Sequence, residues 1–261
     1  SGLAEGSIAA LSYANKLVNL PQGLVVLAVT TAVFPTLSRL FAEEKREEMA
    51  ATLQRAIKMI LLLGVPGAVG LIILREPVVR LILERGAFDE RSTFITAGAL
   101  LYYAVGLAGL CVNLPLTRGF FAMKDTRTPL FIAVASVGVK LIFSLVLVRI
   151  LAHCGLALAT SLAILTNMCV LGWLLERRMP GLFDRVFFRF TGGVCFSAAV
   201  MGVAVHLLDG YMRTLLGGAG FGLLLRTGLD VAAGALVFAA AGLVLRLDEL
   251  LYLLRWLRLR G

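Results

Sequence analysis

Long apolar segments, separated by short polar connections, make up most of the chain. A helix needs roughly 20 apolar residues to cross the hydrocarbon core of a membrane. Seven segments reach that length, so the pattern predicts about seven transmembrane helices. Their predicted limits are Ser7–Leu37, Ala50–Leu74, Ser92–Phe121, Thr128–Ile150, Gly155–Leu175, Phe187–Leu208 and Gly222–Leu245.

The first apolar segment contains a polar stripe. Ser12, Asn15, Lys16 and Asn19 have the spacing that places side chains on one face of a helix. Because an ammonium group inside a spanning helix is costly when it faces lipid, we expect this face to line a cavity and contact a ligand. Pro21 follows the stripe and lacks a backbone N–H, so we expect a bend there.

Composition assigns the chain to the all-α integral membrane class. Of its 261 residues, 59% are hydrophobic and only 16% are charged, and the mean hydropathy is +0.92. Soluble domains carry roughly 25% charged residues. The net charge of +9 would suggest nucleic acid as a partner of a soluble chain. In a membrane protein, basic loop residues that set the topology explain this net positive charge better. We therefore expect no nucleic-acid partner.

Basic residues concentrate in alternate connections. By the positive-inside rule, the richer set lies in the cytoplasm together with the end of the chain. This set consists of Arg39, Lys45, Arg46, Arg118, Lys124, Arg127, Arg177, Arg178, Arg185, Arg189, Arg246, Arg255, Arg258 and Arg260. The poorer set, with Arg226 among its members, is then placed outside.

Two amphipathic elements flank the spans. The segment Pro77–Arg85, ended by Gly86, is expected to be a short helix on the outer surface. The tail 247–261 carries a leucine stripe among arginines and is expected to lie along the cytoplasmic headgroups. The chain begins outside at Ser1 without a visible signal, so we expect an upstream span to be missing.

Four basic residues within the spans belong to neither set of connections, namely Lys16, Arg55, Lys58 and Lys140, and we look for function among them. Lys16 faces a cavity more plausibly than it snorkels, because amides surround it. Arg55 is expected to snorkel to the cytoplasmic surface, whereas for Lys58 snorkelling and a cavity role are equally favoured. Pro66 lies one or two turns beyond Lys58 and is a candidate hinge. Lys140 is far from both interfaces and must face a ligand or a buried acid. Acidic residues are essentially absent from the seven spans, so Lys140 has no obvious partner.

Other candidate chemistry is sparse. Arg127 stands in a tight turn before a span, where it is either part of a connector or a group that attracts an anionic headgroup. The four cysteines have no C-x-x-C spacing and the two histidines stand alone, so no metal site or cofactor is expected. No catalytic motif is present, and we expect no enzymatic activity.

Several short motifs, taken in order along about Ser1–Pro129, resemble the second-lobe opening of the MurJ (MviN) lipid II flippases. These flippases belong to the multidrug/oligosaccharidyl-lipid/polysaccharide exporter superfamily. The matching motifs are Gly6-Ser7-Ile8, Tyr13-Ala14-Asn15-Lys16-Leu17, Leu20-Pro21-Gln22-Gly23, Phe34-Pro35-Thr36-Leu37-Ser38-Arg39, Glu84-Arg85-Gly86-Ala87-Phe88, Tyr103-Ala104-Val105-Gly106-Leu107, Phe120-Phe121-Ala122 and Asp125-Thr126-Arg127-Thr128-Pro129.

The resemblance implies a C-terminal half of a fourteen-helix flippase that lacks its first lobe. Residues 1–186 would form the second lobe, in about five spans, and 187–246 the C-terminal helix pair. Lys16 occupies the position of a cavity arginine of the family, and Asn15 and Asn19 stand where some members carry acids. Lys140 lies on the eleventh helix, where its ammonium could replace a cation that some members bind.

The expected function is the flipping of lipid II, an undecaprenyl-diphosphate-linked peptidoglycan precursor, across the bacterial inner membrane. The expected binding residues are Lys16, Asn15, Asn19, Lys140, Lys58 and Arg127, with Pro21 and Pro66 as hinges. The expected partners are lipid II, the missing N-terminal lobe and membrane lipids. Three alternatives remain: a flippase for another polyprenyl-linked saccharide, a drug or cation antiporter, and a non-transporting envelope scaffold.

Overall fold

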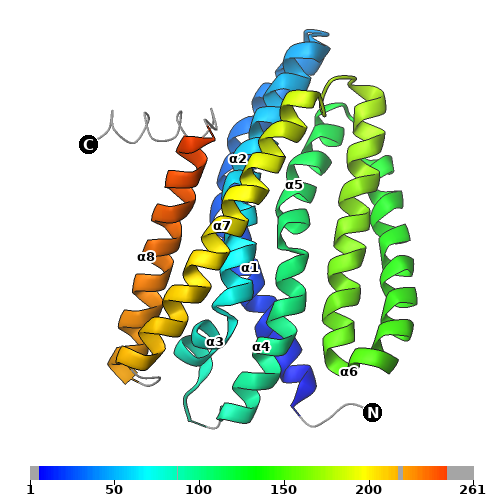
Figure 1. The fold of residues 1–261 in the computed structure, drawn as a ribbon. Coiled ribbons are helices and arrows are strands. Elements are labelled where there is room, and N and C mark those ends of the chain that lie inside the picture. Colours follow the sequence, from blue (N-terminus) through cyan, green and yellow to red (C-terminus); the bar gives the residue numbers. More distant parts are fainter. Residues whose placement is uncertain (1–5, 87, 217–219, 246–261) are drawn as a thin grey trace.

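The computed structural model describes residues 6–86, 88–216 and 220–245, and all regular structure among them is α-helical (Figure 1). The helices run nearly end to end, with connections of only a few residues. Their bounds are α1 Ser7–Ala42, α2 Arg46–Ile73, α3 Arg75–Leu83, α4 Glu90–Val105, α5 Leu107–Ala122, α6 Arg127–Arg178, α7 Arg185–Leu216 and α8 Gly220–Val244.

Among the described residues, α2, α6, α7 and α8 are each long and apolar enough to cross a membrane, and the bent pair α4–α5 makes a fifth candidate. Helix α6 has 52 residues and leaves helical geometry at Ala152, where φ is 49° and ψ is −127°. Its two arms lie side by side in Figure 1. They correspond to the predicted spans Thr128–Ile150 and Gly155–Leu175.

The predicted span Ser92–Phe121 is broken rather than continuous. Helices α4 and α5 meet at Gly106 with a bend of 44°. A Cβ atom at Gly106 would lie 2.8 Å from the Cα atom of Ser161 on the second arm of α6. Only a residue without a side chain permits this contact, because backbone atoms cannot move aside as a flexible side chain can.

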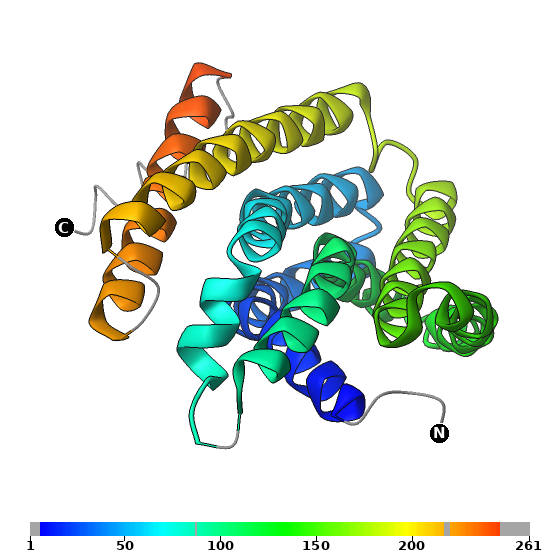
Figure 2. The same cartoon turned by 60° about the horizontal axis from the view of Figure 1, so that its bottom comes forward.

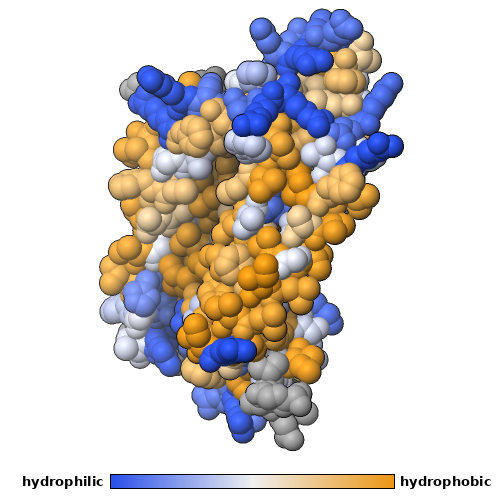
Figure 3. Space-filling model, turned by 90° about the vertical axis from the view of Figure 1, so that its right-hand side faces the viewer, coloured by the Kyte–Doolittle hydropathy of each residue, from blue (hydrophilic) through white to orange (hydrophobic). Residues whose placement is uncertain are grey.

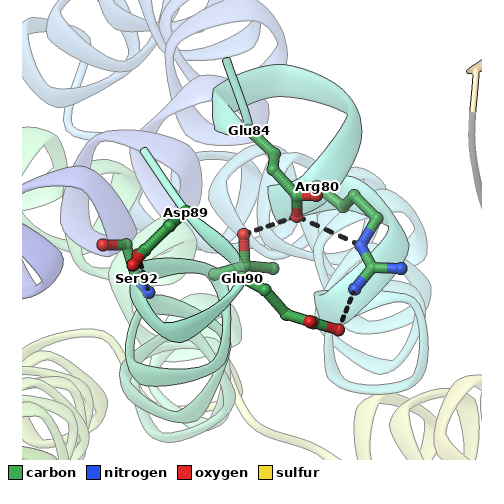
Figure 4. A network of polar contacts seen from close by, with 6 residues as sticks. Arg80, Glu84, Asp89, Glu90 and Ser92 are labelled. Atoms are coloured by element: carbon green, nitrogen blue, oxygen red, sulfur yellow. Dashed lines mark hydrogen bonds and ion pairs between the residues drawn. The ribbon is translucent and has the colours of Figure 1, made fainter. Parts of the chain in front are cut away.

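A polar network fastens the short helix α3 to the start of α4 (Figure 4). The Arg80 guanidinium pairs with Glu84 at 3.1 Å and with Glu90 at 3.1 Å. The Thr93 hydroxyl donates to Glu84 at 2.7 Å. The Asp89 carboxylate accepts from the Ser92 N–H at 2.9 Å and so caps α4. The predicted segment Pro77–Arg85 is therefore helical over most of its length, and Gly86 follows with φ of 63°.

The connections between helices gather at two opposite ends of the bundle (Figure 1). The loops 43–45, 123–126 and 179–184 lie together at one end, with the last turn of α8, and we call this the basic end (Figure 1). Helix α3 and the turn of α6 lie at the other, the α3 end. Between these polar ends, the face that carries α6 is a broad apolar band (Figure 3). Exposed apolar side chains of the first α6 arm include Leu130, Phe131, Val134, Leu141 and Ile142.

Buried apolar side chains form two clusters. The larger one joins α1, α2, α4, α5 and the α6–α7 region, and Phe120, Leu100 and Ile57 are fully buried in it. The smaller one joins α2 with α7 and α8 through residues such as Val194 and Phe238. In Figure 2 helix α7 runs beside α2, with α8 on its outer side. The leucine-rich tail 247–261 lies outside the described residues.

Candidate functional site

The polar stripe of α1 is exposed. Ser12, Asn15, Lys16 and Asn19 all have exposed side chains, whereas the opposite face of α1 buries Ala14, Leu17 and Val18 in the larger apolar cluster. The four polar side chains therefore lie on the side of α1 that faces away from this cluster. An exposed ammonium and two exposed amides on α1 are available to a ligand or to a further element of the protein.

Lys16 has an aromatic neighbour. Its ammonium nitrogen lies 5.6 Å from the centre of the Tyr13 ring, and Tyr13 packs edge-on against Phe88 with ring centres 5.8 Å apart. Tyr13 and Phe88 also line a cavity of about 500 Å³ that contains Arg85. A cation over an aromatic face at this distance is weakly held, so the Lys16 ammonium keeps donors for an anionic partner.

Lys140 is exposed on the first arm of α6, in a stretch where most side chains are exposed. Ser136, one turn before it, donates its hydroxyl to the carbonyl of Ile132 at 2.8 Å. Within the described ranges, no ion pair joins Lys140 to an acid. Lys140 lies on α6 and Lys16 lies on α1, so the two lysines belong to separate helices.

Lys58 is placed differently from Lys16. It is only 8% exposed, and its ammonium lies 5.4 Å from the ring centre of Phe190 on α7. Its helix α2 packs along α7 at this contact (Figure 2). Lys58 thus belongs to the contact between α2 and the C-terminal helices and does not join the exposed stripe. Arg55, on the same helix, is exposed.

Arg127 begins α6 with an exposed side chain. The Asp125 carboxylate accepts from the backbone N–H groups of Arg127 and Thr128, each at 3.0 Å, and from the Thr128 hydroxyl at 2.6 Å. It also pairs with Arg178 at the end of α6. The Thr128 hydrogen bonds, with Arg178 beside them, hold the pKa of Asp125 at about 2. This turn is a capped connector whose Arg127 guanidinium remains accessible.

The predicted hinges lie within unbroken helices. Pro66 lies inside α2, which is continuous from Arg46 to Ile73, and lines an apolar cavity beside α8. Pro21 lies inside the continuous α1, and its side chain is outside the described part of the structure. A bend of 44° lies instead at Gly106, between α4 and α5.

A family model described as Lipid II flippase MurJ matches residues 1–225. The chain belongs to the MurJ family. The resemblance seen in the sequence motifs is therefore confirmed, and so is the all-helical membrane fold. The family is one of transporters.

Individual relatives agree with the family model. A probable lipid II flippase MurJ of Rhizobium tropici is 34% identical over 244 residues, which cover 92% of this chain and 46% of the relative. The corresponding protein of Vibrio cholerae is 29% identical and covers 96% of this chain. A solved structure of lipid II flippase MurJ in an inward closed conformation superimposes with a TM-score of 0.76 at 26% identity, over 94% of this chain and 48% of that one. The chain thus spans about half the length of these MurJ relatives.

Two of the basic residues that the sequence pattern assigned to loops lie inside helices and contact a neighbouring helix. Arg226 is part of α8, is only 5% exposed, and forms an ion pair with Asp209 of α7. Arg118 is part of α5, with its guanidinium 5.4 Å from the ring of Phe34. The positive-inside count treated every arginine near a span end as a loop residue, whereas Arg118 and Arg226 pack within the helical bundle.

Asp230 was also missed from the sequence. It lies inside α8 and is fully buried, so it is an exception to the near absence of acids from the spans. Arg226 and Asp230 are four residues apart, which places both on one face of the helix. Opposite charges at that spacing within an apolar segment were the signal that could have identified them.

Proposed function

We propose that this chain forms the second lobe and the C-terminal helix pair of a flippase that moves lipid II across the bacterial inner membrane by alternating access. Family membership supports this function, and the coverage of half the relatives' length supports the division into lobes. The observation that carries the proposal is the exposed stripe of α1, because a polar face on a spanning helix requires a covering partner.

The proposed cavity uses cationic and amide groups to hold the substrate. Lys16 supplies a charge for the diphosphate, and Asn15 and Asn19 supply adaptable donors and acceptors for phosphate or sugar. Lys140 on α6 provides a second ammonium as the two lobes close around the substrate. Arg127, exposed at the basic end, draws the anionic headgroup toward the cavity mouth.

We propose for Lys58, a member of the expected binding set, a role in helix packing. Its burial against Phe190 makes it part of the packing between α2 and α7. A buried ammonium in such a place fixes the helix contact and is not free to follow a moving substrate. Its role would then be to keep the C-terminal pair attached to the second lobe.

The proposed topology places the basic end and the end of α8 in the cytoplasm. The two apolar clusters support a boundary between a second lobe over 1–186 and a helix pair over 187–246, with an amphipathic cytoplasmic tail over 247–261. The N-terminal lobe, lipid II and membrane lipids are the proposed partners. Movement of the lobe uses Pro21 and Pro66 as hinges, because each lacks the N–H of an ordinary helical residue.

The test is lipid II translocation into vesicles by the complete flippase that contains this half. Lys16→Ala and Lys140→Ala are compared with the unmodified protein, and Lys45→Gln serves as a matched control. Lys45 is an exposed loop lysine paired with Glu43 at 2.9 Å, and such surface pairs contribute little. Wild-type transport in both cavity variants would refute the cavity assignment.

The same assay separates the alternative substrates. Competition by an undecaprenyl-diphosphate that carries another saccharide would point to a different lipid-linked substrate. Efflux of a drug or cation without any lipid carrier would point to an antiporter. Binding of lipid II without translocation would favour a scaffold. The chemistry proposed for the chain is non-covalent binding and release, without catalysis.

A further inference from the structure

Three charged side chains meet between α7 and α8. The Arg226 guanidinium donates through Nε to an oxygen of Asp209 at 2.8 Å and also through a terminal nitrogen. Asp230 lies one helical turn after Arg226 on the same face of α8, the face that meets Asp209 of α7 through Arg226. Arg226 is 5% exposed and Asp230 is fully buried, so these two members of the cluster are removed from water, whereas Asp209 is partly exposed.

The carboxyl group of Asp230 lacks a hydrogen-bond donor. Neither carboxyl oxygen of Asp230 has a hydrogen-bond partner among the described residues. Its neighbour Asp209 is also a carboxyl group and already accepts both hydrogen bonds of Arg226 on one oxygen. The second oxygen of Asp209 and both oxygens of Asp230 are therefore acceptors, and Arg226 gives no hydrogen bond to Asp230. Buried polar groups that lack a donor are rare, because each must give up its hydrogen bonds with water.

The charges of the cluster do not balance. Two ionised carboxylates and one guanidinium leave one uncompensated negative charge. Asp230 lines an apolar cavity of about 440 Å³ between α2, α7 and α8, whose other walls include Pro66, Gly234 and Phe238. Nothing in that lining neutralises a carboxylate, and an unpaired charge in such surroundings is strongly disfavoured.

We propose that Asp230 is a proton-binding site. A proton from water bonds to a carboxylate oxygen of Asp230, and the resulting O–H donates to the free oxygen of Asp209. The three side chains then carry no net charge, and both carboxyl groups gain a hydrogen-bond partner. This inference concerns the C-terminal helix pair and is independent of the substrate proposed above.

A polar cavity at the α3 end gives the proton a route to the cluster. This cavity of about 300 Å³ contains Asp209 and Arg226 in its wall, so the cluster separates it from the apolar cavity that Asp230 lines. Water can reach Asp209 from the polar side. The other charged and titratable groups of its wall are Arg75, Glu76, Arg80, His206 and Arg213.

A metal ion fits the cluster less well than a proton. The Arg226 guanidinium, bonded to Asp209, would repel a cation placed between the two carboxyl groups. Within the described ranges, no group of three His, Cys, Asp or Glu residues is arranged to hold a metal ion. A proton needs only one acceptor beside the atom that carries it, and Asp209 supplies that acceptor.

Infrared spectroscopy of the purified chain tests the proposal. A protonated carboxyl group absorbs above the main peptide band and shifts in heavy water. We expect one such group per chain at pH 7, absent from Asp230→Asn and retained in the control Glu47→Gln, which changes an exposed acid of α2. We also expect its loss in Asp209→Asn, because Arg226 would then neutralise Asp230 directly.

Thermal stability provides a readout that does not depend on a single spectral band. The amide of Asp230→Asn has the size and neutrality of the protonated acid, so this variant is expected to melt near the wild-type temperature at pH 7. Raising the pH removes the proton and lowers the wild-type melting temperature, whereas Asp230→Asn loses that dependence. Absence of the band at pH 7, or its persistence in Asp230→Asn, would overturn the proposal. Stabilisation by Na⁺ in place of the band would assign the site to a metal cation instead.

Discussion

The Ser161 hydroxyl, on the second arm of α6, donates a hydrogen bond of 2.6 Å to the carbonyl oxygen of Tyr102 near the end of α4. Its contact with the next carbonyl, that of Tyr103, is 3.3 Å. These carbonyls precede the bend at Gly106, where the regular helical hydrogen bonds are interrupted. Ser161 therefore supplies a donor to the Tyr102 carbonyl at this helix end, whereas the Tyr103 carbonyl also accepts from the Gly106 N–H at 3.0 Å.

Gly106→Ala should destabilise the chain. The new Cβ would lie 2.7 Å from the Ser161 hydroxyl oxygen and 2.8 Å from the Ser161 Cα atom, so α4–α5 and α6 must separate. We expect a loss of about 1–3 kcal/mol, as for other overpacked sites. The measurement is the melting temperature of the chain in detergent.

Gly138→Ala is the matched control for that substitution, because a Cβ at Gly138 meets no atom within 4 Å. The double variant Gly106→Ala with Ser161→Gly sharpens the test. It removes the serine side chain but keeps the Cα atom, so stability should recover only in part. Full recovery would show that backbone approach is not the constraint.

Asp125 should make the chain more stable above about pH 4 than below it. Its pKa is about 2 in the folded chain, against roughly 3.9 in an unfolded one. A depressed carboxyl pKa contributes stability that is present above the unfolded value and is lost as the pH falls toward the folded value. The melting temperature should therefore fall between pH 4 and pH 2, and Asp125→Ala should remove that part of the fall.

At pH 7 the same Asp125→Ala variant should lose about 1 kcal/mol, the usual contribution of a helix cap. Asp89→Ala, which removes the cap of α4, is a comparison of the same kind at the α3 end. Equal acid sensitivity of wild type and Asp125→Ala would contradict the assignment of the depressed pKa to this turn.

Glu176→Ala should loosen the loop between α6 and α7. The two oxygens of Glu176 accept from the backbone N–H groups of Gly181 and Phe183, each at 2.9 Å. Removal of the carboxylate leaves the N–H groups of Gly181 and Phe183 without this acceptor, so the free energy of unfolding should fall by about 1–3 kcal/mol. Trypsin should cut faster near Arg178 and Arg185, as followed by gel electrophoresis. Cleavage at an unchanged rate, with Glu47→Gln as the control, would show that other contacts hold the loop.

Hydropathy predicted most of the architecture because the membrane leaves few alternatives to apolar helices. The span limits agree with the structure to within a few residues for α2 and for both arms of α6. The exposed face of α1 was also predicted, because Asn15, Lys16 and Asn19 share one side at helical spacing. These features depend on local pattern alone.

The features that were missed depend on partners far along the chain. The break at Gly106 is set by Ser161, 55 positions later, whereas a single glycine in an apolar segment is equally typical of an unbroken helix that packs closely against a neighbour. Arg226 resembles a loop residue until its pairing with Asp209 of the preceding helix is known. Lys58 could be interpreted either way until Phe190 was placed beside it. Sequence spacing identifies the face of a helix but not the element that covers it.

Lys16 offers the most direct test of the cavity. Lys16→Gln keeps an amide donor but removes the charge, and a charge-assisted hydrogen bond contributes about 1.5–3 kcal/mol. Lipid II translocation by the complete flippase should therefore fall roughly 10- to 100-fold. Lys16→Arg restores the charge and adds a planar fork that can hold two phosphate oxygens, so its transport should equal or exceed that of wild type. Equal rates for Lys16→Gln and Lys16→Arg would place the substrate away from this face of α1.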